Sequence, residues 1–385
     1  MIDWRESMQQ SYEFYTVDPS TWKDSKPINC VKSCTINRDK SNDTLGSATI
    51  DTSEPLGECY IRAYLVVRQN GVTERVPLGT FLIQTPGESF DGKVSSYSMD
   101  AYTPLIELKG TLPPIGYSIL QGTEILPVAA ALCRENMRAP IITSDISDDT
   151  MIRVDIGEDG KPEGVLVPIS PANPGEYNEY KNLNSDFVSN LDDTWFSFIS
   201  DLLSAAKLEF GFDEFSRVIF EPIRDIGSLQ HVWTYSDDDV SILLPEFTNN
   251  RDLYGIPNVV EVVYSTGTDY KTARVVNDDP NSPISTVNRG REVVHRESNP
   301  NFGGIPTKGM IDDYAEQLLR NLSCLEHTIS YSHGYCPVGL NDCVMLNIKK
   351  AGLTNVKARV ISQSISCETG CRVSETAVYT TKLWR

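Results

Sequence analysis

Four histidines and nine cysteines are the residues that could bind a metal or act as nucleophile and base. His327 and His333 fall on one side of a predicted strand, and Cys336 and Cys343 follow them. Nitrogen and sulfur ligands of this kind suit zinc. A strand that ends in a turn also brings such residues together when no metal is bound. The plainer reading is structural, so we expect no metal.

Two further cysteine pairs have a regular spacing. Cys30 and Cys34, like Cys367 and Cys371, are separated by three residues, which on a strand places both sulfurs on one face. The second pair straddles a predicted turn and would face across a hairpin. The N-terminal sequence MIDWRESMQQ lacks the apolar run of a secretory signal, so we expect free, mostly buried thiols.

Catalytic motifs are not found in the sequence. There is no HExxH, no Gly-x-Ser-x-Gly, no Walker lysine and no glycine-rich dinucleotide loop. Acidic runs such as 237–239 and 278–279 are most simply solvated turns. We therefore expect no catalytic residues, no cofactor and no enzymatic activity, although a glycosidase needs only two acids and motifs alone leave it open.

The formal net charge of −19 argues against binding nucleic acid or anionic membranes, which lysine and arginine drive. The same charge suits a surface that DNA must pass without sticking. No apolar stretch approaches the length that spans a bilayer. We expect a soluble protein made in the cytoplasm, with no membrane insertion.

The N-terminal part predicts strands and hairpins. After a segment at 1–26, residues 27–109 alternate as a compact β domain of five or six strands. The strand at 60–68 turns at Asn70-Gly71 into 72–76, and 78–85 forms a second hairpin with 93–102 around Phe90-Asp91-Gly92.

Residues 110–257 predict an α/β insert domain. Thr123 is the expected N-cap of a helix that runs to about Met137, and a second helix follows Asp193. A tight hairpin is predicted at 212–220. The proline- and glycine-rich region 155–184 predicts a long loop or arm.

Residues 258–385 predict a second β domain with one helix, at 310–326. The helix has apolar residues at spacings of three and four. We expect this stripe to cover the strands predicted downstream, at 327–333, 343–349, 356–366 and 371–384. The expected fold is therefore mainly β with α+β character, and the two β domains are candidates for a distant duplication.

Three stretches resemble the baseplate hub proteins of contractile-tailed bacteriophages. They are VPLGTFLI at 76–83 with the hairpin into 98–102, the region from DTWF at 193–196 to 220–222, and the C-terminal helix followed by PVGLNDCV at 337–344. The last stretch is similar to a Pro-Gly-Asp turn of hubs but has Asn341 before Asp342. The resemblance extends over most of the chain from about residue 27.

The resemblance implies two tail-tube-like antiparallel β-barrel or sandwich domains beside the insert, and a structural virion protein. Three subunits would form a ring of six such domains, seated on the tail tube or a distal tail protein above and on the central spike below. Other baseplate proteins would be partners, and DNA would pass through the channel without specific binding. The location would be the baseplate at the tail tip, after assembly in the host cytoplasm. Alternatives are another tail-tip or distal tail component, a tail-associated glycosidase or peptidase, and a carbohydrate-binding β protein.

Overall fold

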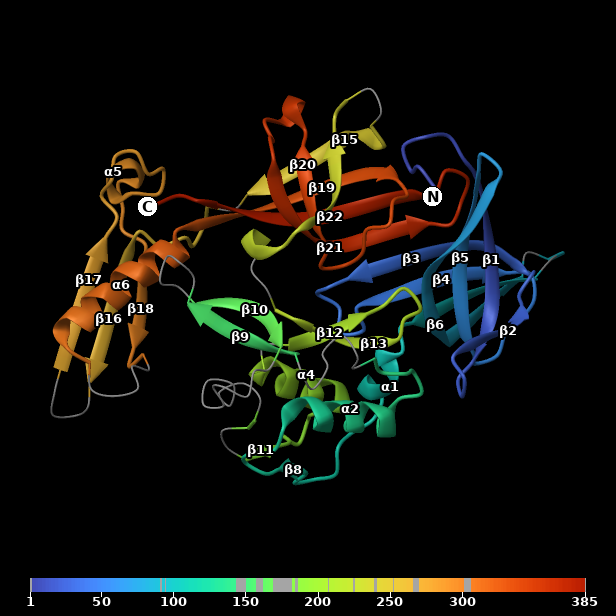
Figure 1. Ribbon diagram of the computed structural model, residues 1–385, viewed down its shortest axis with the longest axis horizontal. Helices are drawn as coiled ribbons and strands as arrows, with labels where there is room; N and C mark the ends of the chain where they lie inside the picture. The colour runs from blue at the N-terminus through green and yellow to red at the C-terminus, as the bar shows by residue number, and fades with distance from the viewer. Residues whose placement is uncertain are drawn as a thin grey trace. The chain divides into compact units, whose positions relative to one another are not determined.

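The computed structural model describes the chain in two compact units (Figure 1). The large unit comprises Met1–Pro245 and Ser332–Glu375, and the small unit comprises Glu246–Tyr331 and Thr376–Arg385. The described residues are 2–90, 92–93, 95–142, 150–156, 162–168, 182–183, 186–206, 208–223, 226–238, 241–251, 253–265, 270–300 and 306–384.

Most strands belong to one large sheet. They are β1 (Gln9–Asp18), β2 (Lys23–Pro27), β3 (Val31–Asp39), β4 (Gly46–Thr52), β5 (Tyr60–Gln69), β6 (Val72–Phe90), β7 (Ser95–Tyr102), β14 (His231–Ser236), β15 (Leu243–Arg251), β19 (Cys324–Gly334), β20 (Cys343–Asn347), β21 (Val356–Ser366) and β22 (Arg372–Lys382). Their hydrogen-bonded order is β15-β19-β22-β21-β3-β4-β7-β6-β5-β1-β2, and β20 pairs with β21 and β14. Together with the sheets described below, this confirms a mainly antiparallel β fold.

The hairpin predicted at Asn70-Gly71 is confirmed. Both residues have positive φ, 50° and 78°, and Gln69 pairs directly with Val72 across the turn. β5 is buried along nearly its whole length, because Ile61, Ala63, Leu65 and Val67 pack in a core cluster and Arg62 and Tyr64 hydrogen-bond Asp24. The two strands predicted at 72–76 and 78–85 are one strand, β6, with a register shift in its pairing with β5.

The N-terminal and C-terminal strands meet at one antiparallel pair, β3 with β21, in register from Ser362↔Asp39 to Ser366↔Thr35. The sequence pattern placed these strands in separate β domains, whereas hydrogen bonds join them in one sheet. The N-terminal segment at 1–26 contains β1 and most of β2.

The region between β7 and β14 contains the helices of the large unit. Its elements are α1 (Leu105–Lys109), β8 (Ser118–Ile119), α2 (Ile125–Asn136), β9 (Thr150–Ile156), β10 (Pro162–Pro168), β11 (Phe187–Val188), α4 (Trp195–Ala205), β12 (Leu208–Phe212), β13 (Val218–Pro222) and η1 (Ile226–Ser228); η2 (Lys349–Ala351) lies later in the unit. The prediction of a cap at Thr123 is wrong, because α2 begins after Glu124, which makes no side-chain cap. Thr194 caps α4 through a reciprocal bond pair with Ser197.

The long loop predicted at 155–184 contains a strand. β10 pairs antiparallel with β9, from Pro162↔Ile156 to Pro168↔Thr150. Apart from 182–183, the remainder of that segment beyond β10 lies outside the described residues.

The small unit is built around a three-stranded sheet and one long helix. Its elements are β16 (Val259–Ser265), β17 (Tyr270–Val276), α5 (Thr286–Arg289), β18 (Val294–Ser298) and α6 (Lys308–Leu322). β16 pairs antiparallel with β17 and parallel with β18. Ile311, Ala315 and Leu319 of α6 form one buried cluster with side chains of β16 and β17.

Two predictions about the helix at 310–326 are therefore wrong. Its stripe covers β16 and β17, not the strands that follow it, because a strand pair formed earlier in the chain offers its apolar face. The helix also ends at Leu322, with Ser323 as C-cap. Leu325 belongs to β19, where every second side chain is buried. No helix in the described part of the chain is long and apolar enough to cross a membrane.

Candidate functional site

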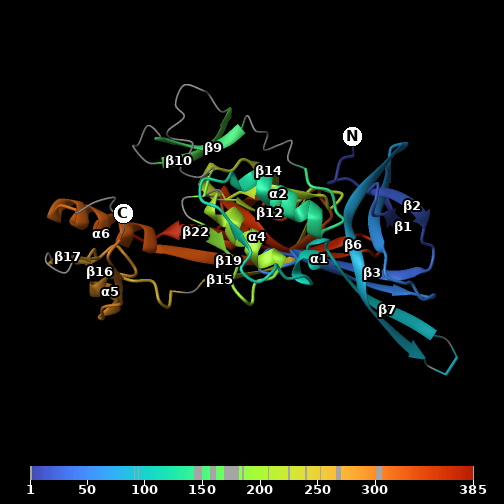
Figure 2. The same ribbon diagram turned by 90° about the horizontal axis from the view of Figure 1, so that it is seen from below.

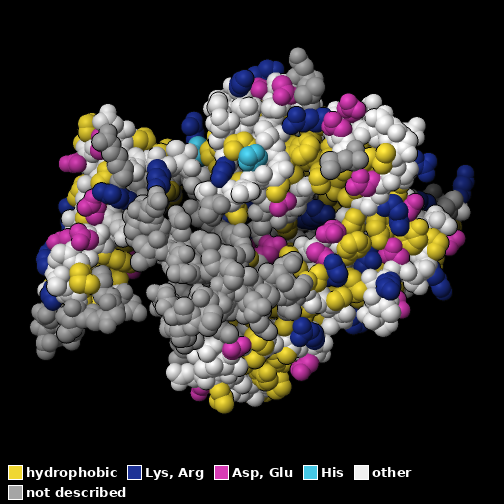
Figure 3. Space-filling view, in the orientation of Figure 1, with side chains coloured by type: hydrophobic (Ala, Val, Ile, Leu, Met, Phe, Trp, Pro, Cys, Tyr) yellow, Lys and Arg dark blue, Asp and Glu magenta, His cyan; other side chains and the backbone are white. Residues whose placement is uncertain are grey.

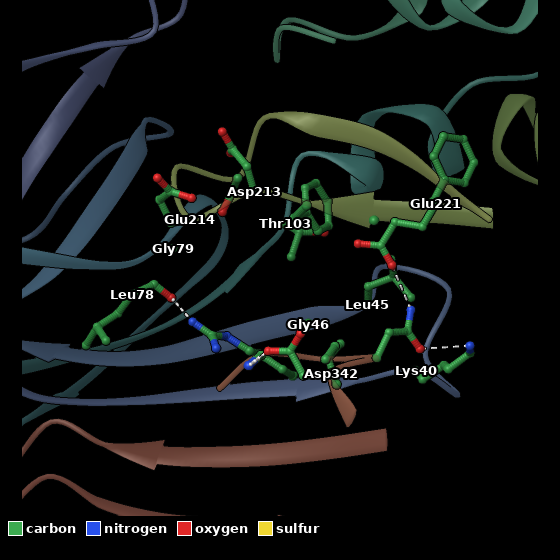
Figure 4. A pocket seen from close by; sticks show the side chains of 18 of the residues that line it. Lys40, Leu45, Gly46, Leu78, Gly79, Thr103, Asp213, Glu214, Glu221 and Asp342 are labelled. Carbon is green, nitrogen blue, oxygen red and sulfur yellow. Dashed lines mark hydrogen bonds between the residues drawn. The ribbon is translucent and has the colours of Figure 1, made fainter. Parts of the chain in front are cut away.

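A cleft of about 700 Å³ opens in the large unit between the β3–β4 turn, β6, the hairpin β12–β13 and the loop 335–342 (Figure 4). We call it the central cleft. Its charged lining residues are Arg38, Lys40, Asp43, Glu74, Arg75, Glu209, Asp213, Glu214, Glu221 and Asp342. Acidic groups thus outnumber basic ones in its walls.

Four polar side chains from different elements are linked at one end of the cleft. Lys40 Nζ lies 2.7 Å from Glu209 Oε1 and 2.8 Å from Asn341 Oδ1. Asn341 Nδ2 donates to Glu209 Oε1 at 3.1 Å and to Glu221 Oε2 at 3.0 Å. Asn341 has a φ of 65°, a left-handed conformation that asparagine tolerates. The amide thereby bridges two carboxylates that Lys40 only partly neutralises.

Burial raises the pKa of Glu221, and the nearby Glu209 and Asp342 carboxylates add to this, while the bond from Asn341 opposes it. Burial also raises the pKa of Asp342, which accepts a 2.7 Å bond from the Gly339 amide. Glu209, in contrast, has an ammonium partner. The cleft therefore contains two neighbouring carboxyl groups in different surroundings, a pair that the sequence did not predict.

Two glycines shape the cleft. A Cβ at Gly211 would lie 2.5 Å from Cδ of Glu221, so that position leaves room for the carboxyl group. Gly79 has a φ of 137°, and a Cβ there would lie 2.8 Å from the Phe81 ring. Larger residues at either position would displace the groups that line the cleft.

A buried polar network lies beside the cleft. Arg38 donates to the Leu78 carbonyl at 2.9 Å and to Gln363 Oε1 at 3.1 Å. Gln363 Nε2 donates to Glu375 Oε2 at 2.7 Å, and Glu375 lies 3.5 Å from His333 Nε2.

Three of the four possible metal ligands of the sequence, His333, Cys336 and His327, contact other side chains. His333 Nε2 lies 3.0 Å from the hydroxyl of Tyr235, which is also 3.2 Å from Cys336 Sγ. His327 belongs to the small unit, where it stacks on Tyr379. In the described ranges, no three His, Cys, Asp or Glu side chains come together as a metal site.

The sequence named no site residues, and it missed the network of Lys40, Glu209, Glu221 and Asn341. Asn341 lay in the turn singled out at 337–344, and Glu209 and Glu221 lay in the stretch from 193 to 222, but neither stretch was given a role for these side chains. Glu221 alternates with the buried Phe220 and looks like an ordinary outward-facing strand residue. Nothing local in the sequence shows that its outward face meets another loop.

Among the described residues, parts of the large sheet have a strand neighbour on one side only. β6 continues beyond Leu82, where its pairing with β5 ends, and pairs there with β7 on one side; the β6–β7 hairpin projects in Figure 2. β15 ends the sheet, and all but its first residue are exposed. β2 ends the other side and is also largely exposed.

These features define a class: a mainly antiparallel β protein with an α/β region between its N-terminal and C-terminal strands and a helix-bearing small sheet. No protein-family model and no curated protein matches the chain.

Solved structures provide the comparison. The chain is similar to the tail protein from Neisseria meningitidis MC58, with a TM-score of 0.55 and 11% identity over 96% of this chain and 97% of that one. It is also similar to the 43 kDa tail protein of prophage MuSo2 from Shewanella oneidensis, with a TM-score of 0.56 and 12% identity over 96% and 98%. A chain of the Francisella PdpA-VgrG complex has a TM-score of 0.50 and 9% identity, over 97% of this chain and 58% of that one. The chain therefore has the fold of these tail proteins.

Proposed function

We propose that this chain is a structural tail protein of a bacteriophage, and specifically the baseplate hub of a contractile tail. In this role three copies form a pseudo-sixfold ring from two tube-like β domains each. The ring joins the sixfold tail tube to the threefold central spike and leaves a channel for DNA. The observation that carries the proposal is the fold similarity to two tail proteins over nearly the full length of all three chains.

Unpaired sheet edges support assembly into a ring. A strand at the end of a sheet presents free amide and carbonyl groups, which lead to aggregation unless something covers them. β15 and β2 are such strands here. In a closed ring of identical subunits, an edge strand at the interface pairs with the neighbouring subunit.

Charge supports passage of DNA without binding. The chain has a net charge of −19, and on the face shown in Figure 3 basic side chains are interspersed with acidic ones. Phosphate binding requires clustered lysine and arginine. A negatively charged channel wall repels the DNA backbone, so the DNA slides without specific contacts.

The test is the mass of the purified chain in solution, with negative-stain images of the same sample. We expect three times the mass of one chain and a threefold ring with a central hole. A monomer, or a particle without a hole, contradicts the proposal.

A variant locates the interface. Phe247 lies on β15 with 39% of its surface exposed, and Phe247→Glu is expected to yield monomers because it places a charge on the edge strand. Leu191 is 81% exposed outside the main sheet, and Leu191→Glu serves as the matched control that keeps the trimer.

The proposal includes the absence of enzymatic activity. Glu209 and Glu221 are the candidate acid pair for a glycosidase. Lys40 hydrogen-bonds Glu209, and Asn341 hydrogen-bonds both carboxyl groups. A zymogram on bacterial cell wall tests this point, and we expect no clearing. If the wild type clears the cell wall and Glu221→Gln does not, hydrolase activity is assigned to the central cleft.

A further inference from the structure

Two cysteines from distant parts of the sequence lie opposite each other where β3 meets β21. The register Ile36↔Ile365 and Thr35↔Ser366 continues by one step to Cys34 and Cys367, and the Cys367 amide donates to the Cys34 carbonyl at 2.9 Å. Directly opposite residues in antiparallel strands have Cα atoms about 4.5–5.5 Å apart. This separation lies in the range that a disulfide spans, about 4.4–6.8 Å.

Both side chains belong to the same buried cluster, and both are free thiols in this structure. A hydrogen bond with the Cys34 side chain, together with burial, raises the pKa of the Cys367 thiol, so exchange through its thiolate is faster at alkaline pH. Opposite side chains on paired strands point to the same face, so the two sulfurs face each other without a change of register.

A cavity of about 460 Å³ leads to the pair. Cys34 and Cys367 line it together with residues of β1 and the segment from Pro27 to Ser33. Lys32 and Asn29 in its wall are exposed, whereas Cys34 is buried, so the cavity connects the thiols to solvent. Cys133, in comparison, is fully buried in the helical core.

We propose that Cys34 and Cys367 are a disulfide-forming pair, oxidised by small disulfides that enter through this cavity. One cysteine thiolate attacks a sulfur of the small disulfide, whose S–S bond breaks and releases one thiol. The second cysteine thiolate then attacks the mixed disulfide and releases the other thiol. Two cysteine thiols are oxidised, one small disulfide is reduced, and the two protons leave on the two released thiols.

The bond would join the N-terminal strands to the C-terminal strands at the one pair where they meet. It closes a loop of about 330 residues, which restricts the unfolded chain strongly. Oxidation is therefore expected to raise the thermal unfolding midpoint of the large unit.

The experiment treats the native full chain with 2-hydroxyethyl disulfide, then blocks the remaining thiols in denaturant and identifies linked peptides by mass spectrometry without reduction. We expect a peptide pair joined through Cys34 and Cys367, lighter by two hydrogens than the reduced peptides, and a higher unfolding midpoint that dithiothreitol reverses. Cys34→Ser and Cys367→Ser should each lose the link and retain a mixed disulfide on the remaining cysteine.

Cys133→Ser is the control that keeps the link. Because serine is nearly isosteric with cysteine, all variants are compared by circular dichroism before oxidation. If Cys34 and Cys367 are both fully labelled by the thiol-blocking reagent after oxidant treatment of the folded protein, they were never oxidised, and the proposal is overturned. A Cys367–Cys371 link that forms instead, since Cys371 lies nearby, would also overturn it.

Discussion

The large unit contains one network of charged groups buried between strands, whereas the ion pairs around Glu261 in the small unit lie at its surface. Glu375 and His333 are each only 1% exposed, and they connect through Gln363 to Arg38. In the small unit, Glu261 accepts hydrogen bonds from Arg274 and Arg296, and the side chain of Arg296 is 76% exposed. Both regions use the same kinds of residue.

The difference lies in what happens when one partner is removed. A buried charge or amide cannot turn to water, so losing its partner costs the full desolvation penalty. An exposed arginine is already hydrated, and salt screens its interaction. The small unit must therefore obtain its stability elsewhere, and the cluster between α6, β16 and β17 is the evident source.

The largest effect is expected from Glu375→Ala. The change leaves Gln363 and His333 buried without their carboxylate, and the cost is about 3–5 kcal/mol of unfolding free energy. Urea unfolding measures it, and hydrogen exchange of the β21 peptides locates it. Glu368→Ala, in the exposed turn after β21, is the matched control. Equal effects of the two substitutions would contradict a special role for the buried network.

Leu319→Ala probes the source of stability in the small unit. Leu319 is fully buried in the α6 cluster, and a leucine-to-alanine change at such a site costs about 2–5 kcal/mol. Faster hydrogen exchange should appear in the peptides of α6, β16 and β17. Met310→Ala on the same helix, where the side chain is 46% exposed, should leave exchange unchanged. Similar exchange in both variants would mean that the helix contributes little.

Glu221→Gln tests the partly buried acid of the central cleft. Because the folded pKa of Glu221 is raised, the folded chain binds this proton more tightly than the unfolded chain, and its contribution to stability is lost as pH rises through the folded pKa. The stability of Glu221→Gln relative to the wild type should therefore increase as pH rises from about 4.5 towards neutrality. Denaturation midpoints across this range measure it, with the exposed Glu214→Gln as control. A difference that does not vary with pH would contradict the raised pKa.

The smallest effect is expected from Arg296→Ala. Glu261 keeps its bond to Arg274, and both arginine and glutamate face water. The thermal midpoint should not shift measurably at physiological salt. A clear loss of stability would show that the surface ion pairs support the small unit after all, and the comparison between the two regions would fail.

Local elements were predictable where the residues next to each other in sequence are enough to specify the structure. The Asn70-Gly71 turn, the start of α4 and the hairpin β12–β13 each depend on neighbouring residues. The end of α6 was missed because Leu325 fits the spacing of the helix by chance. In the structure it is one of the alternating buried residues of β19. The partner of the α6 stripe was missed because an apolar face does not specify which sheet it will cover.

By itself the sequence determined the β-rich class, turns such as Asn70-Gly71 and the negative net charge. Composition is a property of the sequence alone, and residue spacings of two, three or four are local. Only the tertiary structure decided that β3 pairs with β21, that Asn341 bridges Glu209 and Glu221, and that Cys34 faces Cys367. These contacts join residues more than a hundred positions apart. Strand order and register fix such contacts, and both follow from the packing of the whole chain.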